Sequence, residues 1–316
     1  MGNKDITDFN EAQLRKRAAS KEELNICLTN NYAFQKIFKN EEIVKGFLIA
    51  LLHLKETDIE ELEVTDPFVE GEVKEEKEGI LDVKLILNGG KKINIEMQNT
   101  YQEDWAERSL FYNCRMFTEG LKKGESYYEL PPCIHVGILD FNYLKSPGFY
   151  HRILLKDDTT GELYSSKFQF HVIELSKIAT TKGKARKQDL YKWAKLISAS
   201  TWEEIREESE GNHYMEKVRD EMIKMSRDES ERYLYLREQM AIRDKASQLR
   251  SAEKRGRREG ELLKLILQIQ KKIQKNKELH QIADEVEEEV IKIQPIYEAI
   301  KEHPEADKEE IYKMLK

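Results

Sequence analysis

Apolar and polar residues alternate along two short neighbouring segments, residues 80–87 and 91–99. Side chains of a β-strand point alternately to its two faces, so a period of two residues predicts a strand with one apolar face. The alternate apolar positions are Leu81, Val83, Leu85 and Leu87 in the first segment and Ile93, Ile95 and Met97 in the second. The linking sequence Asn88-Gly89-Gly90 is typical of a tight turn, so the two segments predict an antiparallel hairpin.

The register of this hairpin follows from its apolar faces if both faces line one core. The expected pairs are Leu81 with Met97, Val83 with Ile95 and Leu85 with Ile93. The loop then has three residues, with a glycine available for a left-handed position, and Asp82 lies directly opposite Glu96. A two-residue loop at Gly89-Gly90 would instead pair Asp82 with Met97 and send the two carboxylates to opposite faces. That register mixes apolar and polar side chains on both faces, so we expect the three-residue loop.

Two acids that face each other across a hairpin indicate a cation site. The Cβ atoms of directly opposed residues are about 4.5–5.5 Å apart, and like charges so placed destabilise a sheet. A hard divalent cation would neutralise Asp82 and Glu96. The competing interpretation is that both acids only make a strand face soluble. The position of Asp82 inside the apolar run Ile80-Leu81-Asp82-Val83 argues against it, because an unpaired carboxylate is costly there.

The remaining patterns predict helices and strands around this hairpin. Helical spacing of apolar residues predicts helices from about residue 32, over residues 42–54 and over residues 102–123. Apolar runs predict strands near residues 60–67, over 134–141 and over 168–175, with a hairpin tip near 157–161.

The last third of the chain has a different composition. From about residue 214 to residue 258 the sequence is rich in Glu, Lys, Arg and Met and has no proline, which predicts a long helix. An apolar stripe follows over residues 262–293, with a spacing of three or four residues in its second half. We expect these C-terminal helices to bury the stripe on the core domain or on a second copy of the chain.

Charge and hydropathy set limits on function. The chain has 316 residues, of which 36% are charged, and a formal net charge of -7. This charge argues against a protein that coats nucleic acid over its whole surface, but a protein that binds nucleic acid locally needs positive charge only where the nucleic-acid backbone lies. No segment approaches the roughly 18 apolar residues of a membrane span. The first residues are polar, so we expect a cytoplasmic protein without membrane contact.

The residues around the two acids resemble a known nuclease family. Ile80-Leu81-Asp82-Val83-Lys84, a glycine turn and Ile93-Asn94-Ile95-Glu96-Met97-Gln98 are similar to the core of the PD-(D/E)XK nuclease fold, and more narrowly to the Rpn family of recombination-promoting nucleases and transposases. Residues 29–38 resemble the family's opening helix, and the resemblance covers about residues 28–260. It implies an α/β (α+β), restriction-endonuclease-like core in which helices flank a mixed central sheet, plus a helical C-terminal extension.

The resemblance also implies which residues form the site. Asp82 and Glu96 are the expected metal ligands, and they hold one or two divalent ions, usually Mg²⁺ or alternatively Mn²⁺, against the scissile phosphate. Gln98 occupies the third catalytic position, where the wider superfamily has Lys and the Rpn family commonly has Gln. An uncharged amide can orient the attacking water, which leaves more of the electrostatic stabilisation to the metal.

Three accessory positions are expected near these residues. Lys84 lies on the Asp82 face and would supply a nearby positive charge. Arg108 and Arg115 are two turns apart on one helix and form either phosphate contacts or a solvated, ion-paired stripe. Asn31 replaces the Asp that is usual in the family. It serves either as a helix cap or as a neutral oxygen near the metal, with one charge fewer.

Two histidines lie within predicted strands, and we do not place either in the site. His135 and His171 are isolated from other chemistry-bearing residues in the sequence, which is typical of hydrogen-bonded structural histidines.

These expectations divide the chain into a charged segment over residues 1–28, a nuclease-like domain over 29–211 and a helical interaction or regulatory region over 212–316, through which the protein would form homo-oligomers. The leading hypothesis is a Mg²⁺-dependent DNA endonuclease that hydrolyses phosphodiester bonds, linked to recombination or to a mobile element. One alternative, motivated by Asn31, is a nuclease-fold protein that binds DNA or a protein partner but cuts poorly. The other is a helical scaffold.

Overall fold

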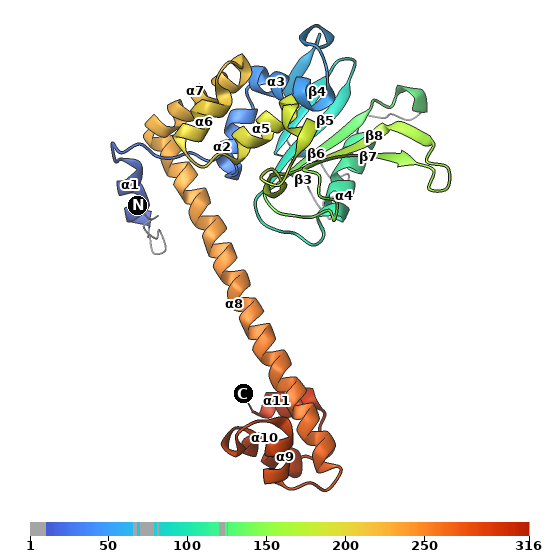
Figure 1. Ribbon diagram of the computed structural model, residues 1–316, viewed down its shortest axis with the longest axis vertical. Helices are drawn as coiled ribbons and strands as arrows, with labels where there is room; N and C mark the ends of the chain where they lie inside the picture. The colour runs from blue at the N-terminus through green and yellow to red at the C-terminus, as the bar shows by residue number, and fades with distance from the viewer. Residues whose placement is uncertain are drawn as a thin grey trace. The chain divides into compact units, whose positions relative to one another are not determined.

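The computed structural model describes residues 11–65, 68–69, 79–80, 82–119, 124 and 126–315. Contacts within the chain divide it into two compact units, one ending at Gln239 and the other running from Met240 to Lys316. Helix α8 (Glu229–Ile273) contributes residues to both units (Figure 1).

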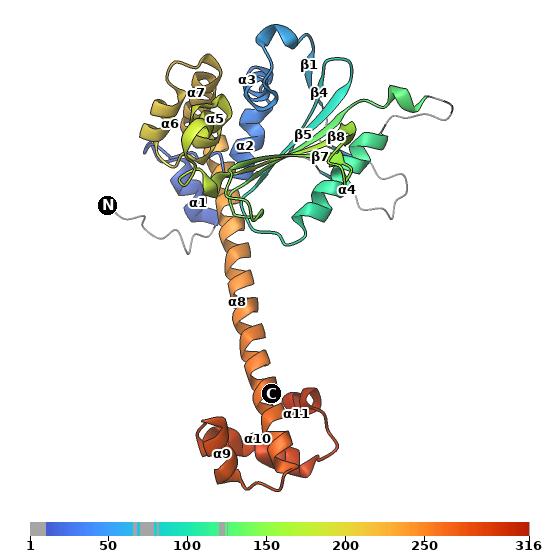
Figure 2. The same cartoon turned by 45° about the vertical axis from the view of Figure 1, so that its right-hand side comes forward.

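A six-stranded mixed sheet forms the centre of the first unit, with the order β1-β4-β5-β6-β8-β7 (Figure 2). The strands are β1 (Leu62–Thr65), β4 (Val83–Leu87), β5 (Lys91–Gln98), β6 (Cys133–Leu139), β7 (Tyr150–Lys156) and β8 (Leu163–Glu174). The strands β2 (Phe68–Val69) and β3 (Gly79–Ile80) pair with each other separately. Parallel pairs join β5 to β6 and β6 to β8, and the other pairs are antiparallel. The predicted mixed sheet is therefore confirmed.

Helices cover both faces of this sheet. Helix α4 (Trp105–Thr118) makes the crossover that a parallel β5–β6 pair requires and lies on one face, whereas α2 (Asn31–Phe38) and α3 (Glu41–Leu52) lie on the other (Figure 2). Phe38, Phe47 and Trp193 meet edge to face with ring centroids 5.5–6.3 Å apart, which joins α2, α3 and α5 (Asp189–Ser198) into one layer. The other helices of this unit are α1 (Glu11–Ala18), α6 (Trp202–Ser209) and α7 (His213–Arg227). The short 3-10 turns are η1 (Glu56–Asp58), η2 (Tyr127–Glu129), η3 (Leu175–Lys177) and η4 (Gly183–Lys187).

The predicted hairpin register is confirmed over the described residues of β4 and β5. Val83 pairs with Ile95, Leu85 pairs with Ile93, and three residues remain in the loop. Those loop residues, Asn88, Gly89 and Gly90, have φ angles of 28°, 61° and 88°. Glycine adopts such positive φ angles without the steric penalty of a Cβ atom, so the turn chemistry and the apolar pattern agree.

The predicted strand over residues 80–87 begins too early. Pairing between β4 and β5 ends at Val83, Asp82 forms a bend, and Ile80 belongs to β3 instead. Leu81 lies outside the described residues, so its expected pairing with Met97 stays a prediction. Because of this bend, Asp82 is not part of the strand, and contacts outside the β4–β5 pairing determine where its side chain lies.

The predicted long helix of the last third is interrupted at Asp228. Helix α7 ends at Arg227, and the Asp228 side chain accepts a hydrogen bond from the backbone N–H of Glu231 at 2.9 Å. An Asp that accepts such a bond caps the start of the next helix, so α8 begins at Glu229 as a separate helix.

The second unit has a small apolar core of its own. The end of α8 packs with α9 (Leu279–Val286), α10 (Val290–Glu302) and α11 (Lys308–Met314). The most deeply buried side chains are Ile266, Ile269, Ile282, Ile293 and Ile311. The expectation that this stripe needs the core domain or a second chain to cover it was wrong, because these helices cover it for one another. Across the described residues, no helix combines the length and apolar character of a bilayer span.

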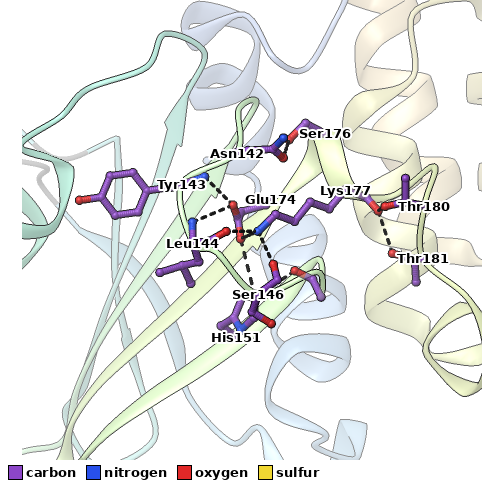
Figure 3. A network of polar contacts seen from close by, with 11 residues as sticks. Asn142, Tyr143, Leu144, Ser146, His151, Glu174, Ser176, Lys177, Thr180 and Thr181 are labelled. Atoms are coloured by element: carbon purple, nitrogen blue, oxygen red, sulfur yellow. Dashed lines mark hydrogen bonds and ion pairs between the residues drawn. The ribbon is translucent and has the colours of Figure 1, made fainter.

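A buried ion pair holds the loop that follows β6 (Figure 3). Glu174, at the end of β8, is fully buried, and its Oε2 accepts a hydrogen bond from Lys177 Nζ at 2.6 Å. Its Oε1 accepts from the backbone N–H groups of Tyr143 and Leu144 at 2.6 and 3.1 Å. Lys177 Nζ also donates to the carbonyls of Leu144 and Ser146. One carboxylate and one ammonium group thus satisfy four backbone groups of a single loop.

This loop in turn positions the start of α4. The Tyr143 ring packs edge-on against Trp105 with centroids 5.3 Å apart, and its hydroxyl accepts a hydrogen bond from the backbone N–H of Ala106. Trp105 lies so close to β6 that a Cβ at Gly137 would come within 2.2 Å of Trp105 Cζ2. The first turn of α4 is therefore fixed against the sheet, one turn before Arg108.

The buried ion pair gives a stability prediction. Replacing Lys177 with Met should destabilise the first unit by about 3–5 kcal/mol, because it leaves the Glu174 carboxylate buried without its cation. Urea unfolding followed by tryptophan fluorescence measures this, since all three tryptophans, at 105, 193 and 202, lie in the first unit. The control is Ser176→Ala, which removes one exposed hydrogen bond to Asn142 and should cost less than about 1 kcal/mol. Equal losses in the two variants would contradict the role of the ion pair.

Candidate active site

Glu96 is a buried acid on the face of the sheet that α4 covers. It lies on β5 between Asn94 and Gln98, and only 2% of its surface is exposed. Its Oε1 accepts hydrogen bonds from Gln98 Nε2 at 2.8 Å and from Arg108 Nη2 and Nε at 2.8 and 3.2 Å. Its Oε2 is buried and has no hydrogen-bond partner. All the donors around this carboxylate therefore act on one oxygen.

Asp82 reaches β5 through its carboxylate and not as a ladder partner of Glu96. Its Oδ2 accepts a hydrogen bond from the backbone N–H of Met97 at 2.8 Å, next to Glu96 in the chain. Its Oδ1 accepts from Gln35 Nε2 at 2.9 Å, which connects the acid to α2. The ladder ends at Val83 and the side chain of Asp82 supplies the acceptor for the next N–H of β5.

The two acids influence each other electrostatically. Burial raises the pKa of Asp82 to about 7, and the nearby negative charge of Glu96 raises it as well. The hydrogen bonds from Met97 and Gln35 and the charge of Arg108 act in the opposite direction. Two carboxylates and one guanidinium group thus share one partly buried environment with an excess of negative charge.

Gln98 is a nearly buried amide at the end of β5. Its Nε2 donates to Glu96 Oε1, and its Oε1 accepts a hydrogen bond from Gln102 Nε2 at 3.0 Å. An amide oxygen has two lone pairs, so Gln98 can still accept one more hydrogen bond. Its orientation is set from both ends, by Glu96 and by Gln102 in the loop before α4.

His135 lies behind Glu96 on β6, in a contact that the sequence did not reveal. The ring is fully buried, and burial lowers its pKa, so it is neutral at physiological pH. Asn94 Nδ2 lies 3.2 Å from His135 Nδ1, and His135 Nε2 lies 3.6 Å from Glu96 Oε2. If the Asn94 amide donates to Nδ1, the ring proton resides on Nε2 and faces the carboxylate.

Of the other basic residues expected near the site, one contacts Glu96 and two contact residues outside the site. Arg108 lies at Glu96, as described. Lys84 stands opposite Asn94 as the register predicts, but its ammonium pairs with Glu119 Oε1 at 2.7 Å. The Arg115 guanidinium lies over the ring of Phe111 with 5.8 Å to the centroid.

Asn31 is placed at the edge of the site by a neighbouring amide. Its Oδ1 accepts a hydrogen bond from Asn99 Nδ2 at 3.4 Å, and Asn99 directly follows Gln98. The interpretation of Asn31 as the cap of this helix was wrong. The N-cap is Asn30, whose side chain accepts from the backbone N–H of Ala33, and Asn31 is the first residue within α2.

A comparison with protein-family models identifies the family of this chain. A family model described as PD-(D/E)XK nuclease family transposase matches residues 28–252, which include β5, α4 and all residues of the site. The chain belongs to the PD-(D/E)XK nuclease family transposases. The membership expected from the resemblance to Rpn nucleases is thereby confirmed. Comparisons with curated proteins and with solved structures give no match.

PD-(D/E)XK nucleases generally use divalent metals, and the donors present here suit one. Among the residues that the structure describes, no three His, Cys, Asp or Glu side chains are grouped to hold an ion. Mg²⁺, however, is commonly bound by one or two carboxylates and keeps several water ligands. Asp82 and Glu96 supply two such carboxylates, and a cation would relieve the repulsion between their negative charges. The donor set therefore fits a hard divalent ion.

Three residues of this candidate site were not predicted from the sequence. Gln35 and Gln102 hold Asp82 and Gln98 in place, and His135 lies beside Glu96. Gln35 was within the segment that resembles the family's opening helix, which was an available signal. His135 reaches Glu96 only because parallel pairing aligns Asn94 with His135, and the sequence does not disclose that pairing.

The raised pKa of Asp82 predicts how stability depends on pH in metal-free protein. An acid whose pKa rises from 3.8 to about 7 on folding binds more protons in the folded state between these values, so the wild-type free energy of unfolding falls as pH rises through this window. Asp82→Asn removes this effect. The variant should gain stability relative to wild type from pH 4 to pH 7.5, measured by urea unfolding in a chelator.

A matched control is Asp157→Asn. Hydrogen bonds from Thr160 and Thr159 lower the pKa of the exposed Asp157, so any effect of its titration is complete below pH 5. Its stability difference from wild type should be constant between pH 5 and pH 7.5. A constant difference for Asp82→Asn as well would show that Asp82 titrates normally.

Proposed function

We propose that this protein is a divalent-metal-dependent DNA endonuclease that hydrolyses phosphodiester bonds in the cytoplasm, in recombination or in the movement of a mobile element. The observation that carries the proposal is the pair of mutually repelling acids, Asp82 and Glu96, within the residues that the family model matches. A cation between the two acids would stabilise the pair, and a cation at the same place would stabilise the charge that develops on a phosphodiester during hydrolysis.

In this proposal Asp82 and Glu96 hold Mg²⁺ or Mn²⁺, and the bound ion would polarise the phosphoryl oxygens. Gln98 acts on the attacking water, because its amide oxygen retains a lone pair for a water proton. The water oxygen forms a bond to phosphorus and releases a proton to the solvent, the bond from phosphorus to the leaving oxygen breaks, and that oxygen takes up a proton from the solvent. Gln98 orients the water but, as an amide, cannot act as the base that receives its proton.

Two cations near the acids have different roles. The Arg108 side chain is 33% exposed and lies at the acids, so we assign it to contact with the DNA phosphate. Lys84 is held by Glu119, so its charge acts on the site only from a distance.

The reaction requires the two acids. Asp82→Ala and Glu96→Gln should each lower Mg²⁺- and Mn²⁺-dependent nicking of supercoiled plasmid by about 100-fold or more, because each removes a charge that stabilises the metal and the transition state. Gln98→Ala should give a smaller loss, because water positioning is weakened while both acids remain. The control is Glu63→Gln, which removes an exposed acid from β1 and should leave the rate unchanged.

Other outcomes of this assay would separate the competing functions. Equal nicking by wild type and Asp82→Ala would eliminate the metal-dependent mechanism. Salt-sensitive retention of DNA without nicking would favour the nuclease-fold binder, the alternative favoured by the neutral Asn31 at the edge of the site. Protein that neither cuts nor binds DNA but self-associates through residues 212–316 would favour the scaffold.

A further inference from the structure

Arg108 and a metal ion would compete for the same carboxylate oxygen. Glu96 Oε1 already accepts three hydrogen bonds, two of them from the Arg108 guanidinium group. A carboxylate oxygen offers about two lone pairs, so Oε1 has no free direction for a metal. The other oxygen, Oε2, is buried beside the His135 ring, with Nε2 3.6 Å away, so Oε1 is the oxygen on the side of Arg108. Coordination at Oε1 requires that Arg108 withdraw.

The charges around the site make Arg108 the counter-ion of the acids in the absence of metal. Its guanidinium group lies 2.8 Å from Glu96 Oε1, and its positive charge also attracts the carboxylate of Asp82. A divalent ion would supply two positive charges to the same acids, and the arginine would then be repelled. The electrostatic preference therefore reverses when an ion arrives.

The Arg108 side chain has solvent-exposed space into which it can move. Its side chain is 33% exposed, whereas that of Glu96 is 2% exposed, so the arginine lies on the open side of the buried acid. It also lies over the ring of Tyr112, with Cζ 5.0 Å from the centroid. Trp105 fixes the first turn of α4 on β6, so the backbone of Arg108 stays in place while its side chain moves.

We propose that Arg108 and the catalytic metal exchange at Glu96. The guanidinium group occupies the carboxylate in metal-free protein, leaves when the ion binds, and then contacts the scissile phosphate. The planar fork of arginine suits both partners, because carboxylates and phosphates accept paired N–H donors in the same geometry. This proposal rests on the metal-dependent function proposed above and adds a step that couples metal binding to substrate binding.

Equilibrium Mn²⁺ binding to the full-length protein tests the exchange without relying on activity. Arg108→Gln should bind Mn²⁺ about tenfold more tightly than wild type, measured by the electron paramagnetic resonance signal of free Mn²⁺, because the competing cation is gone. The rise in melting temperature on adding Mn²⁺ should be larger in the same variant. Arg108→Lys keeps the competing charge and should stay near the wild-type affinity.

Arg115→Gln is the matched control for charge. It removes the same charge from the same helix two turns away, so its Mn²⁺ affinity should remain near that of wild type. An equal gain in Arg115→Gln and Arg108→Gln would overturn the exchange, because the effect would then be a general one of net charge.

Nicking at saturating Mn²⁺ tests the second half of the exchange. Arg108→Gln should cut more slowly than wild type despite its tighter binding of metal, because the phosphate loses its contact. Faster cutting would overturn the phosphate role, because Arg108 would then act only as a competitor of the metal at Glu96.

The failure of the exchange and the failure of the proposed function are distinguishable. If wild type binds Mn²⁺ and Arg108→Gln binds it equally or more weakly, the exchange is overturned while the metal-dependent function stands. If neither protein binds Mn²⁺ and neither cuts DNA, both proposals are overturned.

Discussion

The site depends on one buried negative charge, the Glu96 carboxylate on a central strand of the sheet. A carboxylate that is 2% exposed is stable only when donors or cations surround it. Three hydrogen bonds from Gln98 and Arg108 meet this need at Oε1, and the neutral ring of His135 stands 3.6 Å from Oε2. Asp82 adds a second acid beside Glu96, so the single positive charge of Arg108 acts on two negative charges. That excess of charge is the physical basis of the proposed metal site.

Helix α4 links the environment of Glu96 to the packing of the sheet. The helix carries Arg108, and Trp105 in its first turn packs closely against Gly137 on β6. Tyr143 covers Trp105 from the loop after β6, and that loop is held by Glu174 and Lys177 at the end of β8. A buried ion pair two strands away from Glu96 thus helps to determine where the guanidinium group lies. Fold stability and site geometry are connected through this one path of contacts.

The site is also built largely from amides. Gln35, Gln98 and Gln102 hold the acids and one another, and Asn31 and Asn99 form a further amide pair at the end of β5. Amides orient carboxylates and water without adding charge, so the balance of charge rests on the acids, Arg108 and whatever cation binds. A site of this composition is sensitive to the gain or loss of a single positive charge, which is the condition under which an arginine and a metal compete.

The β4–β5 hairpin, its three-residue loop and the family could be predicted from the sequence, because period-two apolar spacing, a glycine turn and the residues around the acids are all local along the chain. The sequence also marked Arg108 as a residue to consider. The tertiary structure decided what these residues contact. The bend at Asp82, the pairing of Lys84 with Glu119 and the approach of His135 to Glu96 each depend on segments distant in sequence. The same holds for the separate core of the C-terminal helices, because an apolar stripe shows that a face must be buried but does not show which surface will cover it.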